Sequence, residues 1–304
     1  MKTSVIWLYR KFVGVDMGGD TMKTKKKAMI FLFIAAGIIL IGGILTAANL
    51  HSVLHFLKEK RDLMGECVPV LAYHGFVPQD IKDQYYYDNK WIDSTEHFEK
   101  QIKYLSDNGW TALSIDEFYD WQQKKQTIPE KSCLITFDDG YYEMYYQVLP
   151  ILEKYHFNGV SFVVGAYTPD VTPAYDPMQR HNIGWDKIHE TEKTYPGLRF
   201  ESHSYNLHGH DANGSEPWKT ASLTELKNDF AAADRYGFKY MAYPYGGFND
   251  NMLKAAEQSN IKMAFTFKTP NYATQRCSPY KVPRQKVTAE TSFKEFKKIM
   301  EKAE

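Results

Sequence analysis

The sequence predicts an α/β fold whose sheet is mostly parallel, either open or closed into a barrel, after about residue 67. Short apolar runs of strand-forming residues alternate with longer segments of helical periodicity, which is typical of parallel sheets. No repeat or low-complexity linker interrupts this alternation, so we expect one domain over residues 67–304. With 304 residues, of which 43% are hydrophobic, the chain can bury a substantial core.

The N-terminus predicts a membrane anchor. Lys-Thr-Lys-Lys-Lys at residues 23–27 precedes an uncharged apolar segment at residues 28–50, which is long enough to cross a bilayer as a helix. Because such lysines stay in the cytoplasm, we expect residues 1–27 to be cytoplasmic and residues 51–66 to form a polar stalk outside the membrane. A cleaved signal peptide is the alternative, which would make the protein secreted, although residues 46–48 match a cleavage site only weakly.

Local patterns predict the elements of the domain in turn. The first strand, residues 68–73, ends at His74-Gly75 and leads into a polar, tyrosine-rich loop. Serine or aspartate followed three residues later by glutamate predicts the start of a helix, and glycine after an apolar face predicts its end. On these signals we expect strands at residues 133–137, 160–164, 200–202, 239–243 and 262–267, and helices at 93–109, 114 onward, 141–156, 222–237, 251–258 and 292 onward.

Charge and cysteine usage exclude two classes of function. Lys+Arg and Asp+Glu both number 37, and no basic stripe or nucleic-acid-binding motif occurs, so nucleic acid is not an expected partner. The three cysteines are odd in number and lack a C-x-x-C spacing. They therefore indicate neither a disulfide framework nor a thiolate metal site.

Two adjacent carboxylates, Asp138 and Asp139, follow the strand at residues 133–137 and precede Gly140. Successive side chains of a strand point in different directions, so the two acids suit two jobs, such as holding a metal and taking a proton. In a parallel barrel, function gathers at this carboxyl end of the strands. The alternative is a plain turn, because Asp and Gly are ordinary turn residues.

Histidines follow a later strand, within residues 201–211. Two neutral imidazoles and one carboxylate suit zinc or another divalent transition metal and leave a coordination position for water. We expect Asp139 to supply the carboxylate and His203 and His208 the imidazoles, with His210 in place of His208 as the alternative register. Surface-loop histidines without a metal are the other interpretation.

A third motif, Tyr243-Pro244-Tyr245-Gly246-Gly247, ends another predicted strand. Such a turn can aim a backbone N–H at a reacting oxygen, as an oxyanion hole requires. By itself the motif is weak, since turns everywhere use these residues.

Together and in this order, Thr-Phe-Asp-Asp-Gly, His-Ser-x-x-x-His and Tyr-Pro-Tyr-Gly resemble the polysaccharide deacetylases of carbohydrate esterase family 4, which share the NodB-homology domain. The histidine spacing and Leu-Ala-Tyr-His-Gly at residues 71–75 are most similar to the biofilm poly-N-acetylglucosamine deacetylases of the IcaB and PgaB type. The resemblance runs from about residue 68 to the C-terminus. It implies a distorted (β/α) barrel, here preceded by one transmembrane helix.

Roles follow from the resemblance position by position. It implies a divalent metal on Asp139, His203 and His208, with Zn²⁺ expected and Co²⁺, Ni²⁺ or Mn²⁺ as alternatives. It implies that Asp138 is the general base that takes a proton from the attacking water. The backbone N–H of Tyr245 would then share the negative charge that develops on the acetamide oxygen.

Two positions depart from the family pattern. Many members orient the base with an arginine in the third motif, where this chain has Ala242, so Arg284 is our candidate replacement and a structural salt bridge is the alternative. Many members use a late histidine as the acid, but no histidine follows His210 here. His74 is therefore the candidate acid or substrate contact, with a structural role as the alternative.

The expected substrate is an extracellular polymer. We assign Tyr243, Pro244, Trp185 and Trp218 to sugar contacts, with core packing as the alternative for the tryptophans. The expected reaction is metal-dependent hydrolysis of N-acetyl groups from poly-β-1,6-N-acetyl-D-glucosamine, which releases acetate, at the membrane and alongside an exopolysaccharide synthase complex. Peptidoglycan N-acetylglucosamine as substrate and a non-catalytic polysaccharide-binding module are the alternatives.

Overall fold

The computed structural model of the protein describes residues 67–268 and 272–303. The predicted membrane-spanning segment, residues 28–50, and both of its flanks lie outside the described residues. Within the described ranges, no helix is long and apolar enough to cross a membrane.

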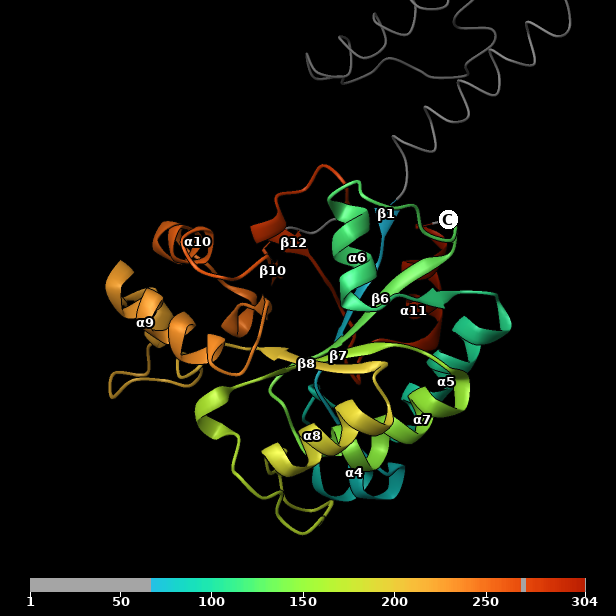
Figure 1. Cartoon of the computed structure of the whole chain (residues 1–304). Coiled ribbons are helices and arrows are strands. Elements are labelled where there is room, and N and C mark those ends of the chain that lie inside the picture. The colour runs from blue at the N-terminus through green and yellow to red at the C-terminus, as the bar shows by residue number, and fades with distance from the viewer. Residues whose placement is uncertain (1–66, 269–271, 304) are drawn as a thin grey trace, which may run out of the picture. The chain divides into compact units, whose positions relative to one another are not determined.

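A nearly closed parallel barrel forms the centre of the described domain (Figure 1). Its strands follow the order β12-β10-β9-β8-β7-β6-β2-β13, and every pairing along this path is parallel. The strands are β2 (Val70–Tyr73), β6 (Ser132–Phe137), β7 (Gly159–Val163), β8 (Leu198–Ser202), β9 (Tyr240–Ala242), β10 (Met263–Thr266), β12 (Val282–Pro283) and β13 (Gln285–Lys286). The expected parallel sheet is therefore present, and it is nearly closed into a barrel rather than open.

One short segment brings the two edges of the sheet together. β12 pairs with β10 at one edge and β13 pairs with β2 at the other, and only Arg284 separates these two strands in the sequence. The sequence analysis predicted neither strand, because two-residue strands around a proline carry no recognisable alternation.

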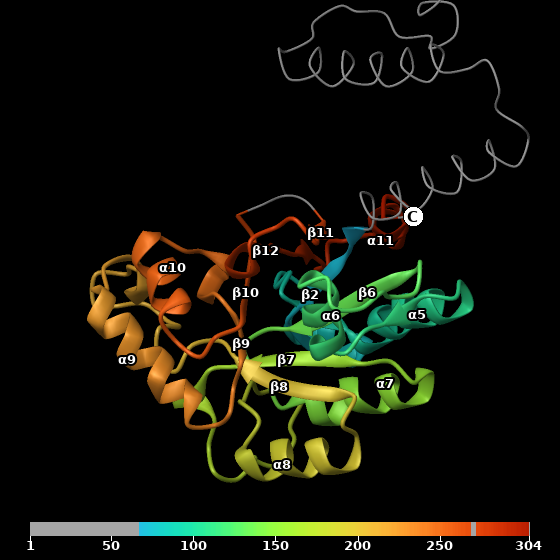
Figure 2. The same ribbon diagram turned by 45° about the horizontal axis from the view of Figure 1, so that its top comes forward.

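Helices surround the barrel (Figures 1 and 2). In both views α5, α7 and α8 follow one side of β6 to β8, while α9 and α10 lie together beside β9 and β10. The helices are α4 (Gln79–Tyr85), α5 (Thr95–Asp107), α6 (Ile115–Gln122), α7 (Leu149–Tyr155), α8 (Trp185–Thr194), α9 (Leu223–Asp234), α10 (Asp250–Glu257) and α11 (Phe293–Glu301). The smaller strands are β1 (Cys67–Val68), β3 (Gly75–Val77), β4 (Ile92–Ser94), β5 (Thr111–Ala112) and β11 (Ala273–Thr274).

Capping signals located most of the helices correctly. The predicted capping boxes that begin at Ser114, Ser222 and Ser292 are confirmed, since in each the serine and the glutamate three residues later exchange hydrogen bonds with the backbone. The predicted box at Asp93 is wrong by one residue, because Ser94 caps α5 by accepting from the His97 N–H. Asp93 instead binds the His97 ring at 2.8 Å.

Three helical segments differ from the expected elements, and the short strands β3, β4, β5 and β11 were not predicted either. The tyrosine-rich loop after β3 contains α4, and α8 was not expected at all. α8 begins at Gly184 without a side-chain cap, so it lacks the signal that marked the other helices. The helix expected over residues 141–156 begins instead as a π-helical turn, Met144–Val148, before α7.

Strand alternation decides which side chains point into the barrel. In β6, Ile135 and Phe137 pack in the cluster beneath the outer helices, whereas Leu134 packs in the interior cluster. The inward parity of Leu134 continues to Asp138, one residue beyond the strand. Val282 also packs in the interior cluster, and the same parity brings Arg284 inward.

Candidate active site

A polar pocket of about 320 Å³ opens at the carboxyl ends of the strands. It gathers side chains from all three sequence motifs and from the end of β2, namely His74, Asp138, Asp139, His203, His208 and Tyr245. A larger cavity of about 480 Å³ borders α4 and the start of α5, but none of those six residues lines it. The pocket at the strand ends is therefore the candidate active site, where parallel barrels place their chemistry.

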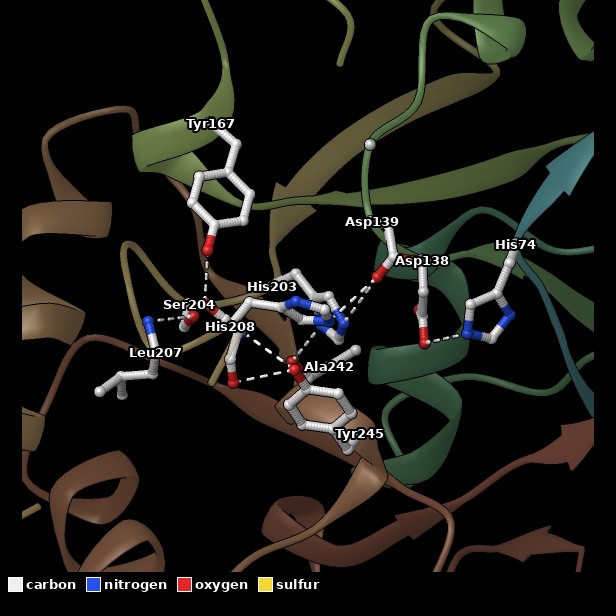
Figure 3. Close-up of polar contacts among 12 residues, drawn as sticks. His74, Asp138, Asp139, Tyr167, His203, Ser204, Leu207, His208, Ala242 and Tyr245 are labelled. Atoms are coloured by element: carbon white, nitrogen blue, oxygen red, sulfur yellow. Dashed lines mark hydrogen bonds and ion pairs between the residues drawn. The ribbon is translucent and has the colours of Figure 1, made fainter. Parts of the chain in front are cut away.

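Asp139, His203 and His208 lie close enough together to hold one metal ion (Figure 3). The Asp139 Oδ1 atom is 3.5 Å from Nε2 of His203 and 3.2 Å from Nε2 of His208. The ligand atoms of all three residues lie within 4.8 Å of one another, and His210 does not belong to this group.

A second contact prepares His203 as a ligand. Its Nδ1 lies 2.8 Å from the Ala242 carbonyl oxygen, which can only accept, so Nδ1 carries a proton and the neutral ring would offer the lone pair of Nε2 to a metal. Two imidazole nitrogens and one carboxylate oxygen are the donor set of a catalytic zinc site. The residues present therefore fit a divalent metal of that kind.

The loop that carries both histidines is tied down by a buried carboxylate. Asp229 of α9 accepts the backbone N–H of Tyr205 at 2.8 Å and that of Asn206 at 2.7 Å. Burial raises the pKa of Asp229 to about 6, although these two N–H groups favour its charged form. The Ser204 hydroxyl also accepts the Leu207 N–H at 3.1 Å.

Backbone strain marks the same three loops. Asp139, Ser204 and Tyr245 have positive φ angles of 73°, 73° and 58°. This left-handed region costs a residue with a side chain about 1–3 kcal/mol, and such strain clusters at functional sites. One strained residue thus occurs in each of the three sequence motifs that supply the pocket.

Arg284 binds Asp138, the aspartate that does not belong to the metal-ligand group. Its two terminal nitrogens donate to the two oxygens of Asp138, each at 2.7 Å, and both side chains are buried. Nη1 also donates to the Thr136 hydroxyl at 3.2 Å. The structure therefore places the candidate replacement arginine in bidentate contact with the candidate base.

The charges in the pocket stabilise one another. Burial alone raises the pKa of Asp138, but the Arg284 guanidinium and the His203 ring outweigh it, so the pKa is lowered. Burial likewise opposes ionisation of Asp139, yet hydrogen bonds from His203 and His208 hold its pKa well below the usual range. Both carboxylates are consequently ionised at neutral pH.

His74 lies on the side of Asp138 that is away from His203 and His208 (Figure 3). Its Nε2 is 4.0 Å from Asp138 Oδ2, and its ring centroid is 4.5 Å from that of Trp91. Burial lowers the pKa of His74, and the neighbouring Asp139 and Asp138 only partly counter this effect. Within the described residues its Nδ1 is buried without a hydrogen-bond partner.

Tyr245 forms the opposite wall. Its ring stacks on His208, with centroids 4.6 Å apart, and its hydroxyl lies 2.9 Å from both the N–H and the carbonyl oxygen of Gly209. The side chain is 38% exposed, which is enough to meet a ligand in the pocket.

Four predicted sugar contacts lie elsewhere. Tyr243 and Pro244 are buried, and the Tyr243 hydroxyl donates to the Tyr280 carbonyl oxygen at 3.1 Å. Trp185 stacks on Tyr236, with centroids 4.1 Å apart, and Trp218 is buried in a core cluster. None of the four lines the pocket, so the structure assigns them to packing.

The remaining wall consists of residues that the sequence analysis did not single out. They are Asn89, Trp91, Tyr141, Arg180, Phe267 and Lys286. Tyr141 directly follows Gly140, and Lys286 comes two residues after Arg284, so both had a motif as neighbour. Phe267 ends the strand predicted at residues 262–267, and Asn89, Trp91 and Arg180 lie in loops without a recognisable pattern.

Comparison with known proteins defines the class. Residues 125–264 match the family model described as polysaccharide deacetylase, and this segment carries β6 to β9 with the three motifs. The chain therefore contains a polysaccharide deacetylase domain, as the sequence resemblance indicated.

Individual deacetylases are also similar to this chain in sequence or structure. A poly-β-1,6-N-acetyl-D-glucosamine N-deacetylase from Staphylococcus aureus is 28% identical over 200 residues, which cover 63% of this chain and 66% of the relative. The enzyme of the same name from Staphylococcus epidermidis is 27% identical over 262 residues, covering 82% of each chain. The solved structure of a de-N-acetylase from Aggregatibacter actinomycetemcomitans superimposes with a TM-score of 0.64 at 27% identity, covering 76% of this chain and 99% of that one.

Proposed function

We propose that this protein hydrolyses the N-acetyl groups of extracellular poly-β-1,6-N-acetyl-D-glucosamine, with acetate as one product and a glucosamine unit as the other. One observation carries the proposal: Asp138, held by Arg284 behind it, lines the same pocket as Asp139, His203 and His208. A paired, oriented carboxylate beside a set of metal ligands suits hydrolysis, and the two staphylococcal relatives support the substrate.

Asp139, His203 and His208 would hold the metal, which we propose to be Zn²⁺, with Co²⁺, Ni²⁺ or Mn²⁺ as alternatives. When bound there, such an ion supplies Lewis acidity toward the acetamide carbonyl and toward water.

The side chains around the ligands divide the proton transfers between them. Asp138 is ionised and accepts a proton from the attacking water, while Arg284 fixes both of its oxygens in one orientation. The backbone N–H of Tyr245 donates toward the oxygen that becomes negative. His74, whose Nε2 is 4.0 Å from Asp138 Oδ2, passes the proton that Asp138 has accepted on to the nitrogen as the carbon–nitrogen bond breaks, so that an amine leaves. The other product is acetate, and the amine is protonated at neutral pH.

We also propose that the domain acts outside the cell, held at the membrane by residues 28–50. The uncharged apolar segment and the lysines before it support this location. A synthase complex that exports the polymer is the proposed neighbour. Cleavage of the segment would instead give a secreted enzyme, and the N-terminal sequence of mature protein from the membrane fraction distinguishes the two.

Acetate release tests the proposed activity. The purified full chain, loaded with zinc, is incubated with poly-β-1,6-N-acetylglucosamine and, separately, with peptidoglycan. We expect release from the first polymer, a loss of at least about 100-fold in Asp138→Asn, and loss of both bound zinc and activity in Asp139→Asn. Asp107→Asn, which changes an exposed aspartate on α5, is the matched control and keeps full activity.

Other results would point to the alternatives. A clear preference for peptidoglycan would replace the substrate but keep the chemistry. Polymer binding without acetate release at any zinc loading would favour a non-catalytic binding module. Full activity of Asp139→Asn would contradict the metal site.

A further inference from the structure

Two cationic side chains line the pocket without taking part in the proposed reaction. Lys286 of β13 is exposed, and its Nζ is 4.7 Å from the Phe267 ring centroid and 6.0 Å from that of Trp91. Both of these rings also line the pocket. Across residues 67–268 and 272–303, Lys286 forms no ion pair with a carboxylate. No acid therefore neutralises this ammonium at the edge of the pocket in the described part of the chain.

Arg180 is the second cation. Its guanidinium carbon is 3.4 Å from the Tyr141 ring centroid, and its Nε is 3.9 Å from Oε1 of Glu143, too far for a hydrogen bond. In the described part of the chain, both Glu143 oxygens and two of the Arg180 nitrogens are buried without hydrogen-bond partners. Burial raises the pKa of Glu143 to about 7, so its negative charge offsets only part of that of Arg180 near neutral pH.

The acids of the pocket do not compensate these cations. Asp138 and Asp139 are the carboxylates among its lining residues in the described ranges. Asp138 is already paired with Arg284, and Asp139 lies against His203 and His208. The wall near Lys286 and Arg180 therefore presents positive charge to a bound sugar.

Substrate and product differ in the charge at the sugar nitrogen. An acetamide is neutral, whereas the free amine of glucosamine is cationic at neutral pH. The Lys286 ammonium lies over the Phe267 ring and 6.0 Å from the Trp91 ring centroid, so a sugar next to the reacting unit that contacted either ring would lie close to this charge. A neighbouring glucosamine would thus bring one cation against another, and like charges brought together disfavour a complex.

We propose that Lys286 and Arg180 make the site select N-acetylglucosamine units whose neighbours are still acetylated. This inference rests on the proposed function and adds the rule by which the enzyme chooses its positions. Under this rule, each deacetylation makes the adjacent units poorer substrates. The product is then a polymer with spaced rather than clustered positive charges.

Two defined β-1,6-linked pentasaccharides test the rule. One is fully N-acetylated, and in the other the second and fourth units are glucosamine, so that every remaining acetyl group has a cationic neighbour. The zinc-loaded full chain is assayed for acetate release, and the readout is the ratio of kcat/KM between the two. We expect the wild type to favour the fully acetylated oligomer at least about tenfold at low salt. Ionic strength of about 0.5 M should reduce this ratio because salt screens exposed charges.

Substitutions of Lys286 and Arg180 test whether these two side chains cause the preference for the fully acetylated oligomer. Lys286→Met should lower the ratio at least about threefold and Lys286→Glu further, whereas Lys286→Arg should keep it. Arg180→Met is combined with Glu143→Gln, so that no buried carboxylate is left without its cation, and should also lower the ratio. Lys227→Met, an exposed lysine on α9 outside the pocket, is the matched control and should leave it unchanged.

The outcomes separate this inference from the proposed function. Equal kcat/KM on the two oligomers, or a ratio unaffected by Lys286→Glu, would overturn the selection rule and leave the deacetylase activity standing. No acetate from either oligomer would overturn the proposed function and the selection rule with it.

Discussion

The buried pair of Arg284 and Asp138 makes the sharpest prediction, which concerns Arg284→Met. The arginine side chain is 0% exposed and that of the aspartate 2%, and two 2.7 Å hydrogen bonds join them. Removal of one partner from a buried ion pair costs about 3–5 kcal/mol, because the remaining charge stays buried without compensation. We expect Arg284→Met to lower the free energy of unfolding by that amount at pH 7.

The effect depends on pH with a definite sign. Arg284 helps to lower the pKa of Asp138, so its stabilisation is present above the unfolded pKa of about 3.9 and is lost as the pH falls through the folded value. In Arg284→Met, burial dominates and raises the pKa of Asp138, so the variant loses stability as the pH rises. The difference between the two proteins should therefore be larger at pH 7 than at pH 4.

Urea unfolding of the purified full chain measures both effects. A double-mutant cycle with Asp138→Asn should give a coupling energy of about 3 kcal/mol or more at pH 7. Arg276→Met, which removes an exposed arginine, is the control and should change stability by less than about 0.5 kcal/mol. A coupling energy near zero, or the same difference at pH 4 and pH 7, would refute the reasoning.

Three further predictions concern the residues around this pair. His208→Ala should abolish tight zinc binding in a competition titration with a chelator, whereas His210→Ala, outside the ligand group, should retain it. Loss of zinc in His210→Ala and retention in His208→Ala would instead make His210 the ligand. Asp229→Ala leaves two backbone N–H groups without acceptors, so we expect a loss of about 2–4 kcal/mol in urea and a 10–100-fold weaker zinc Kd; unchanged affinity would show that the loop is held otherwise. Burial raises the folded pKa of Glu143 to about 7, so the stability that its neutral form contributes is present below the unfolded pKa and is lost as the pH rises. The free energy of unfolding of Glu143→Gln should therefore rise by about 3 kcal/mol relative to wild type between pH 4 and pH 8. Parallel pH profiles of the two proteins would contradict this.

The parts of the site that lie within recognisable motifs were predictable from the sequence. Asp139, His203 and His208 follow apolar strands, and parallel strands bring their carboxyl ends to one edge, so the ligand group needed only the strand pattern. Arg284 was predicted as the candidate partner of Asp138, but nothing in the sequence showed that it would lie beside that residue. Its contact with Asp138 depends on β12 and β13, which are too short to show a period in the sequence.

The predicted sugar contacts lie outside the pocket for a different physical reason. Tryptophan and tyrosine have an apolar body that suits a core as well as a sugar, and the composition of a loop does not say which. Trp185 and Trp218 are packed, while Trp91 faces the pocket. Lys286 was missed because an exposed lysine at a strand end has no local feature that distinguishes it from any other.

The segment at residues 282–286, which carries β12, Arg284 and β13, has a consequence for the order in which the site can form. β13 pairs with β2, its partner from nearly the other end of the described chain, so the barrel closes only after almost the whole domain has been made. Until then Asp138 lacks the guanidinium that keeps it charged and aimed, although all three metal ligands come earlier in the chain. During synthesis, the three candidate ligands therefore precede Arg284, and the Asp138–Arg284 pair forms only when the last strands of the barrel are made.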